Sequence, residues 1–184
     1  KTGITTFLID NNIDSGSILL KKEVLIEQTE NAGSLHDKLL FHGAPLLIET
    51  LKGVKSGKIK PIKQNISKLE SEAPKLTTEN TRLDWVSPLK ILKNKINGLS
   101  PYPGAWSLFK NNGVVERFKI LKAEIIFEKH IHPLNKILIN DNQIYITNAE
   151  GYLNCLEIQL PNKKRMPAKT LLNGYEFNLD AHVF

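Results

Sequence analysis

The sequence predicts an α/β segment followed by a small all-β barrel. Residues 1–57 hold two short apolar runs and then a long stretch with helical spacing. After Gly104, short apolar runs alternate with turn signals over about 60 residues, which is typical of a small closed barrel. Residues 58–82 are rich in Lys, Asn and Ser and predict a linker. We therefore expect three parts, at 1–57, 58–82 and 83–184.

The first part predicts two strands, at residues 4–9 and 17–26, joined by a polar loop and followed by a helix. The helix should run from Ser34 to about Lys55, because apolar residues recur there every three or four positions. Pro45 should bend this helix or begin a second segment. Its inward face would consist of Leu35, Leu39, Leu46, Leu47, Thr50, Leu51 and Val54.

The third part predicts a short helix, a rigid turn and then strands. The helix should span Trp85 to Ile96, with Asp84 or Ser87 as its cap and Pro88 in its first turn. The prolines of residues 100–104 prevent its continuation. A second short helix is expected from Met166 to Leu172. The expected strands between the two helices lie at residues 104–109, 114–121, 123–128, 136–140, 143–148 and 152–160.

The composition fits a folded protein of one or two domains. Of 184 residues, 41% are hydrophobic and 24% are charged, which is enough for an ordinary core. No apolar run approaches the ~20 residues of a membrane helix, and the first residues do not resemble a signal peptide. Cys155 is the single cysteine and lies in a strand-like run, so we interpret it as a core thiol. We expect a cytoplasmic protein without membrane contact.

Charge is unevenly divided along the chain. Residues 1–57 carry six Lys and Arg against seven Asp and Glu, whereas residues 58–184 carry 19 against 12. The net charges are therefore −1 and +7. A basic half favours contact with a polyanion, although a lysine-rich surface that only maintains solubility explains it equally well.

The loop between the first two strands carries the most informative motif. Residues 10–16, DNNIDSG, place Asp10 and Asp14 four positions apart on a short polar segment. A loop on a rigid scaffold can hold an acid out toward a substrate. The alternative is a turn whose Asp and Asn side chains only close local hydrogen bonds.

Several other kinds of site find no support in the sequence. Phosphate-loop, HExxH, CxxC and GxSxG motifs do not occur. His36 and His42 are six positions apart, not the three or four that place two ligands on one helical face. We interpret both as surface or packing residues, and we expect no metal site.

Seven short motifs follow one another in an order that covers nearly the whole chain: TGIT at 2–5, DNNIDSG at 10–16, SLHDKL at 34–39, APKL at 73–76, LDW at 83–85, SPYPGAW at 100–106 and MPAK at 166–169. Each motif is weak alone, but together and in this order they resemble the methionyl-tRNA formyltransferase family. That family transfers a formyl group from 10-formyltetrahydrofolate to the methionine amino group of initiator methionyl-tRNA.

The resemblance implies roughly the last three-fifths of such an enzyme. The chain would hold the end of a Rossmann-like formyltransferase domain, a linker and an OB-fold-like barrel. An Asn-x-His segment and a Ser-Leu-Leu-Pro folate loop of the family would lie upstream of Lys1. We therefore expect a fragment that is inactive alone, from an enzyme that is monomeric at full length and needs no metal.

The resemblance also assigns the acidic loop. Of the family's catalytic Asn, His and Asp, only the Asp maps onto this chain, at Asp14. Its carboxylate would support a cationic His or organise water for proton transfer, while Asn and His stabilise the oxyanion. The pterin of the folate would be lined by Asp10, Asn11, Asn12 and Ile13. For Asp10 itself, we favour a role in stabilising the turn.

The basic second half fits binding of a tRNA acceptor stem, because backbone phosphates require cations. At residues 96–98 the chain has Ile-Asn-Gly where the family commonly has Ile-Arg-Gly, which removes one cation. Tyr102 and Trp106 could stack on a base, but burial is the favoured interpretation. The candidate tRNA contacts are Lys75 and Arg82 in the linker and Lys163, Lys164 and Arg165 on a late loop.

Two alternatives remain open from the residues. One is a different folate-dependent formyltransferase that acts on a sugar nucleotide. The other is a non-catalytic RNA-binding module, which fits the basic half taken alone. The basic half and the LDW and SPYPGAW motifs favour the tRNA enzyme.

Overall fold

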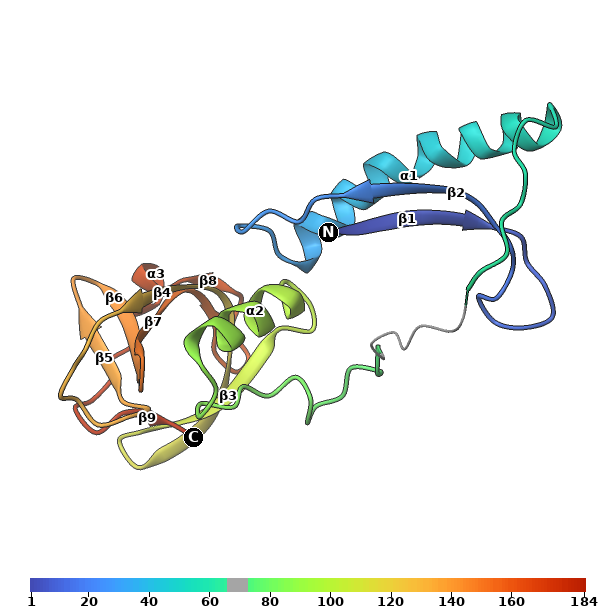
Figure 1. Ribbon diagram of the computed structural model, residues 1–184. Helices are drawn as coiled ribbons and strands as arrows, with labels where there is room; N and C mark the ends of the chain where they lie inside the picture. The colour runs from blue at the N-terminus through green and yellow to red at the C-terminus, as the bar shows by residue number, and fades with distance from the viewer. Residues whose placement is uncertain (66–72) are drawn as a thin grey trace. The chain divides into compact units, whose positions relative to one another are not determined.

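The structure is a computed structural model that describes residues 1–65 and 73–184. The chain forms two compact units, Lys1–Lys75 and Leu76–Phe184 (Figure 1). The division between them falls inside the predicted linker at 58–82. Within the described residues, no helix is long and apolar enough to cross a membrane.

The first unit is built on an antiparallel hairpin of β1 (Thr2–Phe7) and β2 (Ile18–Val24). β-branched residues favour the extended backbone of β1. The chain after the helix returns to this hairpin, because Ile62 and Ile18 exchange two backbone hydrogen bonds of 2.8 Å. The predicted strands at 4–9 and 17–26 are therefore present with shifted ends.

Helix α1 (Ala32–Lys55) packs along the hairpin and begins at a capping box. The side chain of Asn31 accepts a hydrogen bond from the Ser34 backbone at 2.9 Å, and Ser34 Oγ accepts one from the Asn31 backbone at 3.0 Å. Pro45 lies inside one continuous helix, so the expected second segment does not form. Buried contacts directly after Pro45, at Leu46 and Thr50, hold the helix against the hairpin and offset the backbone hydrogen bond that proline removes.

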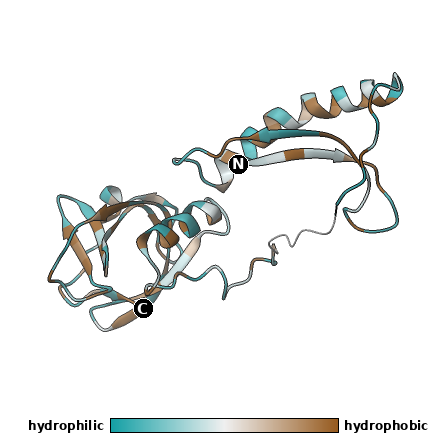
Figure 2. Cartoon of the chain, viewed as in Figure 1, coloured by the Kyte–Doolittle hydropathy of each residue, from teal (hydrophilic) through white to brown (hydrophobic). Residues whose placement is uncertain are grey.

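One face of α1 packs on the hairpin and the rest is exposed. Thr50 Oγ1 lies 2.9 Å from Thr6 Oγ1 of β1, and Leu46 is buried beside it. Leu47, Leu51 and Val54 were expected to face inward, but they are 52%, 62% and 47% exposed. Two strands are too narrow to cover both sides of the apolar stripe, whose hydrophobic residues are visible along α1 in Figure 2. The exposed apolar positions of this helix also include Leu40, Phe41 and Ile48.

The second unit is a nearly closed antiparallel barrel, as the sequence predicted. Its strands are β3 (Ala105–Asn111), β4 (Val114–Phe127), β5 (Ile137–Asn140), β6 (Gln143–Asn148), β7 (Gly151–Gln159), β8 (Met166–Pro167) and β9 (His182–Val183). They follow the order β5-β6-β7-β4-β3-β9, with β8 beside β7. A bridge between Lys136 and His182 joins the two ends of that order, supported by an Ile137-to-Ala181 backbone hydrogen bond of 2.9 Å.

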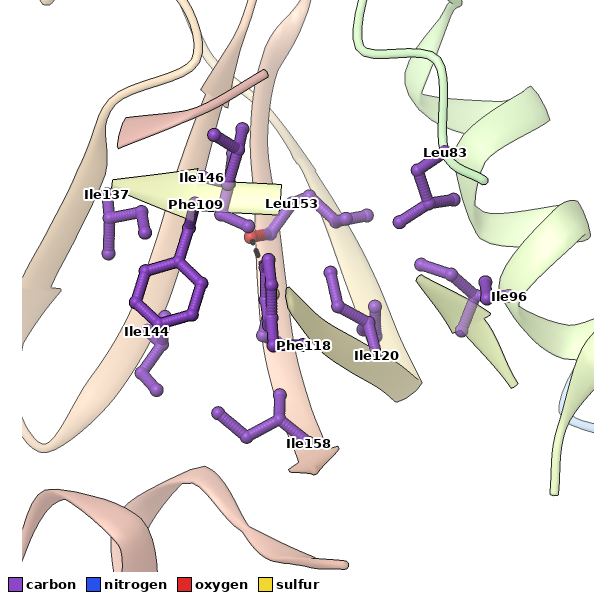
Figure 3. Close-up of a cluster of buried hydrophobic side chains, with 14 of the residues drawn as sticks. Leu83, Ile96, Phe109, Phe118, Ile120, Ile137, Ile144, Ile146, Leu153 and Ile158 are labelled. Carbon is purple, nitrogen blue, oxygen red and sulfur yellow. Dashed lines mark hydrogen bonds between the residues drawn. The ribbon is translucent and has the colours of Figure 1, made fainter. Parts of the chain in front are cut away.

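The barrel encloses one hydrophobic core. Figure 3 shows Phe109, Phe118, Ile144, Ile146 and Leu153 pointing toward one another from different strands. The rings of Phe109 and Phe118 meet edge to face at 5.1 Å between centroids. Cys155 belongs to this core, and burial raises the pKa of its thiol, which confirms the expected core thiol.

Helix α2 (Leu89–Leu99) covers the barrel and starts later than predicted. Asp84 instead forms a turn, in which its carboxylate accepts a hydrogen bond from the Val86 backbone at 3.2 Å. The cap of α2 comes from another part of the chain: Leu89 N donates to Glu150 Oε2 at 2.8 Å. The expected caps at Asp84 and Ser87 are therefore wrong. The last helix, α3 (Ala168–Leu172), begins only after Met166 and Pro167 have joined β7 as β8.

Candidate active-site loop and nucleic-acid interface

The acidic loop projects from the hairpin and is closed at its base. Leu8 N donates to Ser17 O at 2.9 Å, so the chain ends of the loop are held together. A Cβ atom at Gly16 would lie 1.5 Å from the Leu8 carbonyl oxygen, so only glycine fits this position. The base fixes where the residues between Ile9 and Ser15 emerge.

Asp10 organises the loop from within. Its Oδ1 accepts hydrogen bonds from Ser15 Oγ at 2.6 Å and from the Asn12 backbone at 2.9 Å. These bonds, that of Ser15 first, hold the pKa of Asp10 below its usual value, because they favour the charged carboxylate. The turn-stabilising role favoured for Asp10 is thus present in the structure.

Asp14 is held by its backbone and presents its carboxylate outward. Its φ of 54° lies in the left-handed region, which few residues other than glycine adopt. Gln64 Nε2 donates to the Asp14 carbonyl at 2.8 Å and to the Gly16 carbonyl at 2.7 Å. Among the described residues, no hydrogen bond or ion pair engages the exposed Asp14 carboxylate. It is therefore available for a reacting group.

Gln64 is a functional residue that the sequence did not reveal. It lies 48 positions beyond Gly16, in the segment predicted to be a linker, and no local pattern links the two. The exposed apolar side chains at the loop tip are more directly visible in the sequence. Ile9 is 93% and Ile13 is 94% exposed, on either side of the polar residues Asp10, Asn11 and Asn12.

The two histidines of α1 take the surface and packing roles expected of them. His36 Nδ1 lies 3.2 Å from Asp37 Oδ1 at the surface, and the His42 ring contacts Phe41 edge to face. In the described part of the chain, no group of three His, Cys, Asp or Glu side chains could hold a metal ion.

Trp106 anchors the end of the linker to the barrel. It is 9% exposed and its Nε1 donates to the Thr78 carbonyl at 2.7 Å, which confirms the expected burial. The guanidinium carbons of Arg117 and Arg82 lie 4.0 and 5.5 Å from the centre of its ring. Tyr102, in contrast, is 84% exposed, so the burial expected for it is wrong. Prolines on both sides place Tyr102 on a turn that leaves the barrel.

The predicted linker cations have different surroundings. Arg82 Nη2 donates to the Phe184 carbonyl at 3.0 Å, in addition to its contact with Trp106, so it connects the two ends of the second unit. Lys75 is exposed at the end of the first unit.

The late loop gathers cations beside a cleft. Lys163, Lys164 and Arg165 are all exposed between β7 and β8, and Gln159 Nε2 fixes the loop by donating to the Lys163 carbonyl at 2.9 Å. Arg165 also lies 3.6 Å from Glu157. A cleft of about 300 Å³ adjoins the loop, and Arg117 and Lys119 of β4 line it. Their alternation in the predicted strand 114–121 was the signal that could have identified them.

The barrel, its capping helix and the acidic loop occur together in one known class of protein. Residues 75–176 match the family described as the formyl transferase C-terminal domain, and the chain belongs to this family.

The relatives give the particular member of this class that the chain resembles. It is 39% identical over 184 residues to the methionyl-tRNA formyltransferase of Flavobacterium johnsoniae, covering 100% of this chain and 58% of that protein. It is 38% identical to that of Bacteroides thetaiotaomicron, covering 97% of this chain and 57% of the relative. The chain thus spans less than two thirds of the curated relatives it matches, and the family resemblance is confirmed.

Solved structures share the fold at lower identity. HypX from Aquifex aeolicus, in complex with tetrahydrofolic acid, aligns with a TM-score of 0.64 and 20% identity, covering 92% of this chain and 29% of that chain. An N-formyltransferase from Helicobacter canadensis, in complex with folinic acid and dTDP-3-aminofucose, aligns with a TM-score of 0.59 and 19% identity, covering 83% and 54%. At these identities the likeness concerns the fold alone.

Proposed function

We propose that this chain is the C-terminal part of a methionyl-tRNA formyltransferase. The whole enzyme moves a formyl group from 10-formyltetrahydrofolate to the amino group of initiator methionyl-tRNA, a step of protein biosynthesis. The observation that carries this proposal is the 39% identity along the entire chain to the Flavobacterium enzyme. A sugar-nucleotide formyltransferase has support only from fold likeness at 19% identity.

The acidic loop supplies the catalytic carboxylate. The methionine amine attacks the formyl carbon, loses a proton, and the bond from that carbon to the folate nitrogen breaks as the nitrogen takes up a proton. Asp14 supports this exchange by stabilising a cationic histidine or positioning a water that carries the proton. Its exposed carboxylate and anchored backbone suit a group that must keep its position while its partners react.

The loop tip can also hold the folate. The exposed Ile9 and Ile13 side chains offer apolar surface to a flat heterocycle, and the amides of Asn11 and Asn12 offer hydrogen bonds. Asp10 contributes by keeping the turn closed, while its neighbours face the pterin. No metal is needed in this scheme.

The remaining assignments follow from the same family. The hairpin and α1 are the end of a Rossmann-like catalytic domain, residues 58–82 are its linker, and residues 83–184 form an OB-fold-like tRNA-binding domain. The exposed apolar face of α1 is covered by the rest of the full-length enzyme, since the relatives are longer than this chain. The enzyme is cytoplasmic and monomeric.

The barrel holds the tRNA through its basic late loop. Lys163, Lys164 and Arg165 lie beside Arg117 and Lys119, so five cations surround one cleft and its rim. Lys75 and Arg82 add positive charge from the linker. This arrangement suits phosphates, whose neutralisation dominates nucleic-acid affinity.

A filter-binding titration of initiator tRNA tests the proposed interface. Replacing Lys163, Lys164 and Arg165 with Ala should weaken binding and lower the slope of log K against log salt by roughly 0.9 for each duplex phosphate that is no longer neutralised. The matched control replaces the exposed Lys52, Lys55 and Lys58 of the first unit, and should change the slope little. If both triple variants reduce affinity and slope equally, the late loop does not bind the tRNA.

A further inference from the structure

A second pocket lies on the outer surface of the barrel, away from the basic cleft. It measures about 310 Å³, and its walls include Tyr145, Tyr152 and His132, with Glu128 and Asn140 at its rim. Neither the predicted catalytic loop nor the predicted tRNA contacts contribute to it.

The strand register places both tyrosines on the outer face. Tyr152 pairs with Thr147 of β6 and Ile126 of β4, and Tyr145 pairs with Leu138 of β5. Their strand neighbours Ile146 and Leu153 point into the core. Since side chains alternate along a strand, Tyr145 and Tyr152 must face outward.

Tyr152 is the centre of an aromatic cluster. Its ring lies 4.8 Å from His130 at an interplanar angle of 39°, and 6.1 Å from Tyr145 at 75°. His132 approaches it at 6.4 Å. His130 is held in place because its Nε2 lies 2.8 Å from the Asn148 carbonyl. These contacts fix a wall of rings at the surface.

Polar atoms beside this wall lack partners. Asn154 is 5% exposed, and its Oδ1 accepts no hydrogen bond from the described residues, although its Nδ2 donates to Gln143 Oε1 at 2.7 Å. His130 Nδ1 is likewise buried without a partner there. A fold usually satisfies such groups, so these two are available to a ligand or to an ordered water.

The charges around the pocket favour a ligand that carries phosphates. Lys129 follows Glu128 directly, and Lys136 lies beside Thr147 on the strand next to Tyr152. The two lysines outnumber the single carboxylate of the pocket rim, which disfavours a cationic ligand. A base between them would have its sugar-phosphate neighbours near positive charge.

We propose that this pocket binds one unpaired nucleobase of the RNA substrate, an inference that rests on the proposed function. The base stacks on Tyr152 and Glu128 accepts a hydrogen bond from an N–H on its edge. The pocket and the basic cleft occupy opposite ends of the ladder between β4 and β7, which runs from Lys119 opposite Gln159 to Phe127 opposite Gly151. At ~3.3 Å per residue, they are roughly 26 Å apart along the strand, so one RNA can reach both.

Two RNA hairpins with the same stem test the proposal, one blunt and one with four unpaired 3′ nucleotides. Their binding to the 184-residue chain is followed by fluorescence anisotropy. The hairpin with the overhang should bind more tightly, and Tyr152→Ala should weaken it by about tenfold while changing the blunt hairpin less than about twofold. Tyr152→Phe keeps the ring and should bind as the unchanged chain does.

The control is Phe41→Ala, which removes an exposed ring from the first unit and should alter neither affinity. Should Tyr152→Ala fail to fold, Tyr145→Ala serves instead, with the same selective loss expected. Equal binding of both hairpins, or equal weakening of both, overturns this inference and leaves the proposed tRNA interface intact. Displacement of the overhang hairpin by choline would identify a cation pocket and also overturn it. If neither hairpin binds the unchanged chain, the proposed RNA function fails as well.

Discussion

The two units of this chain differ sharply in how much apolar surface they bury. In the first unit, Val24 and Leu46 are the fully buried hydrophobic residues of the described region. In the second, a single cluster draws side chains from both helices and from most strands of the barrel. Because burial of apolar area dominates folding free energy, the barrel has the means to fold by itself and the hairpin with α1 does not.

This difference corresponds to the proposed roles. The barrel is a self-contained body that can present a fixed surface to RNA. The first unit carries the acidic loop on a scaffold whose helix leaves Phe41, Leu47, Ile48 and Leu51 exposed. Its loop is nonetheless held by specific hydrogen bonds, so the geometry of the motif is more local than the stability of the unit.

Separating the units should produce the largest effect. Residues 76–184 alone are expected to unfold cooperatively, with a midpoint close to that of the main transition of the full chain. Residues 1–65 alone should show no cooperative transition, because they lack a core of sufficient size. Circular dichroism during heating distinguishes the two pieces. A sharp transition for residues 1–65 would remove the contrast between the units.

Core substitutions sharpen the same comparison. Phe109→Ala empties the centre of the barrel core and should lower its free energy of unfolding by about 3–5 kcal/mol. Leu46→Ala, the matched truncation in the first unit, should leave that transition unchanged within about 0.5 kcal/mol, since distant sites act independently. Guanidinium titration followed by fluorescence of the buried Trp85 measures both. A similar loss in the two variants would show that the units fold together.

The smallest predicted effect concerns the acidic loop and pH. The pKa of Asp10 is lowered in the folded loop, so its hydrogen bonds stabilise the loop above the ordinary value of 3.8 and are lost as pH falls through the lower folded value. Ser15→Ala removes the largest cause and should raise the pKa of Asp10 toward 3.8. Carboxyl NMR titration of both proteins tests this. An unchanged pKa in Ser15→Ala would contradict the hydrogen-bond network of the loop.

The sequence predicted the barrel well because its strand boundaries depend on local chemistry. The turns at Asn111–Gly113 and Asn140–Asn142 separate strands where the structure also separates them. The order of the strands and the outward position of Tyr145 follow from that pattern. The acidic loop was also predictable, since Asp10 closes it through bonds to residues two and five positions away.

The features that could not be predicted depend on contacts between distant residues. Glu150 caps α2 across 61 positions, and Gln64 holds Asp14 across 50. Arg82 contacts Phe184, at the other end of the unit, as well as Trp106. The inward face of α1 was partly wrong for the same reason, because the width of the hairpin decides which apolar residues are covered.

In the proposed division of roles, the first unit contributes to chemistry and the barrel contributes to RNA binding. Single-turnover formylation by the full-length enzyme, measured across tRNA concentrations, tests it directly. Asp14→Asn should lower the rate at saturating tRNA by roughly 10²–10⁴-fold with tRNA affinity unchanged, and Asp10→Asn should lower it far less. Replacing Lys163, Lys164 and Arg165 with Ala should weaken tRNA affinity and leave the saturated rate unchanged. A normal saturated rate for Asp14→Asn, or a saturated rate abolished by removing the late-loop cations, would contradict this division of roles.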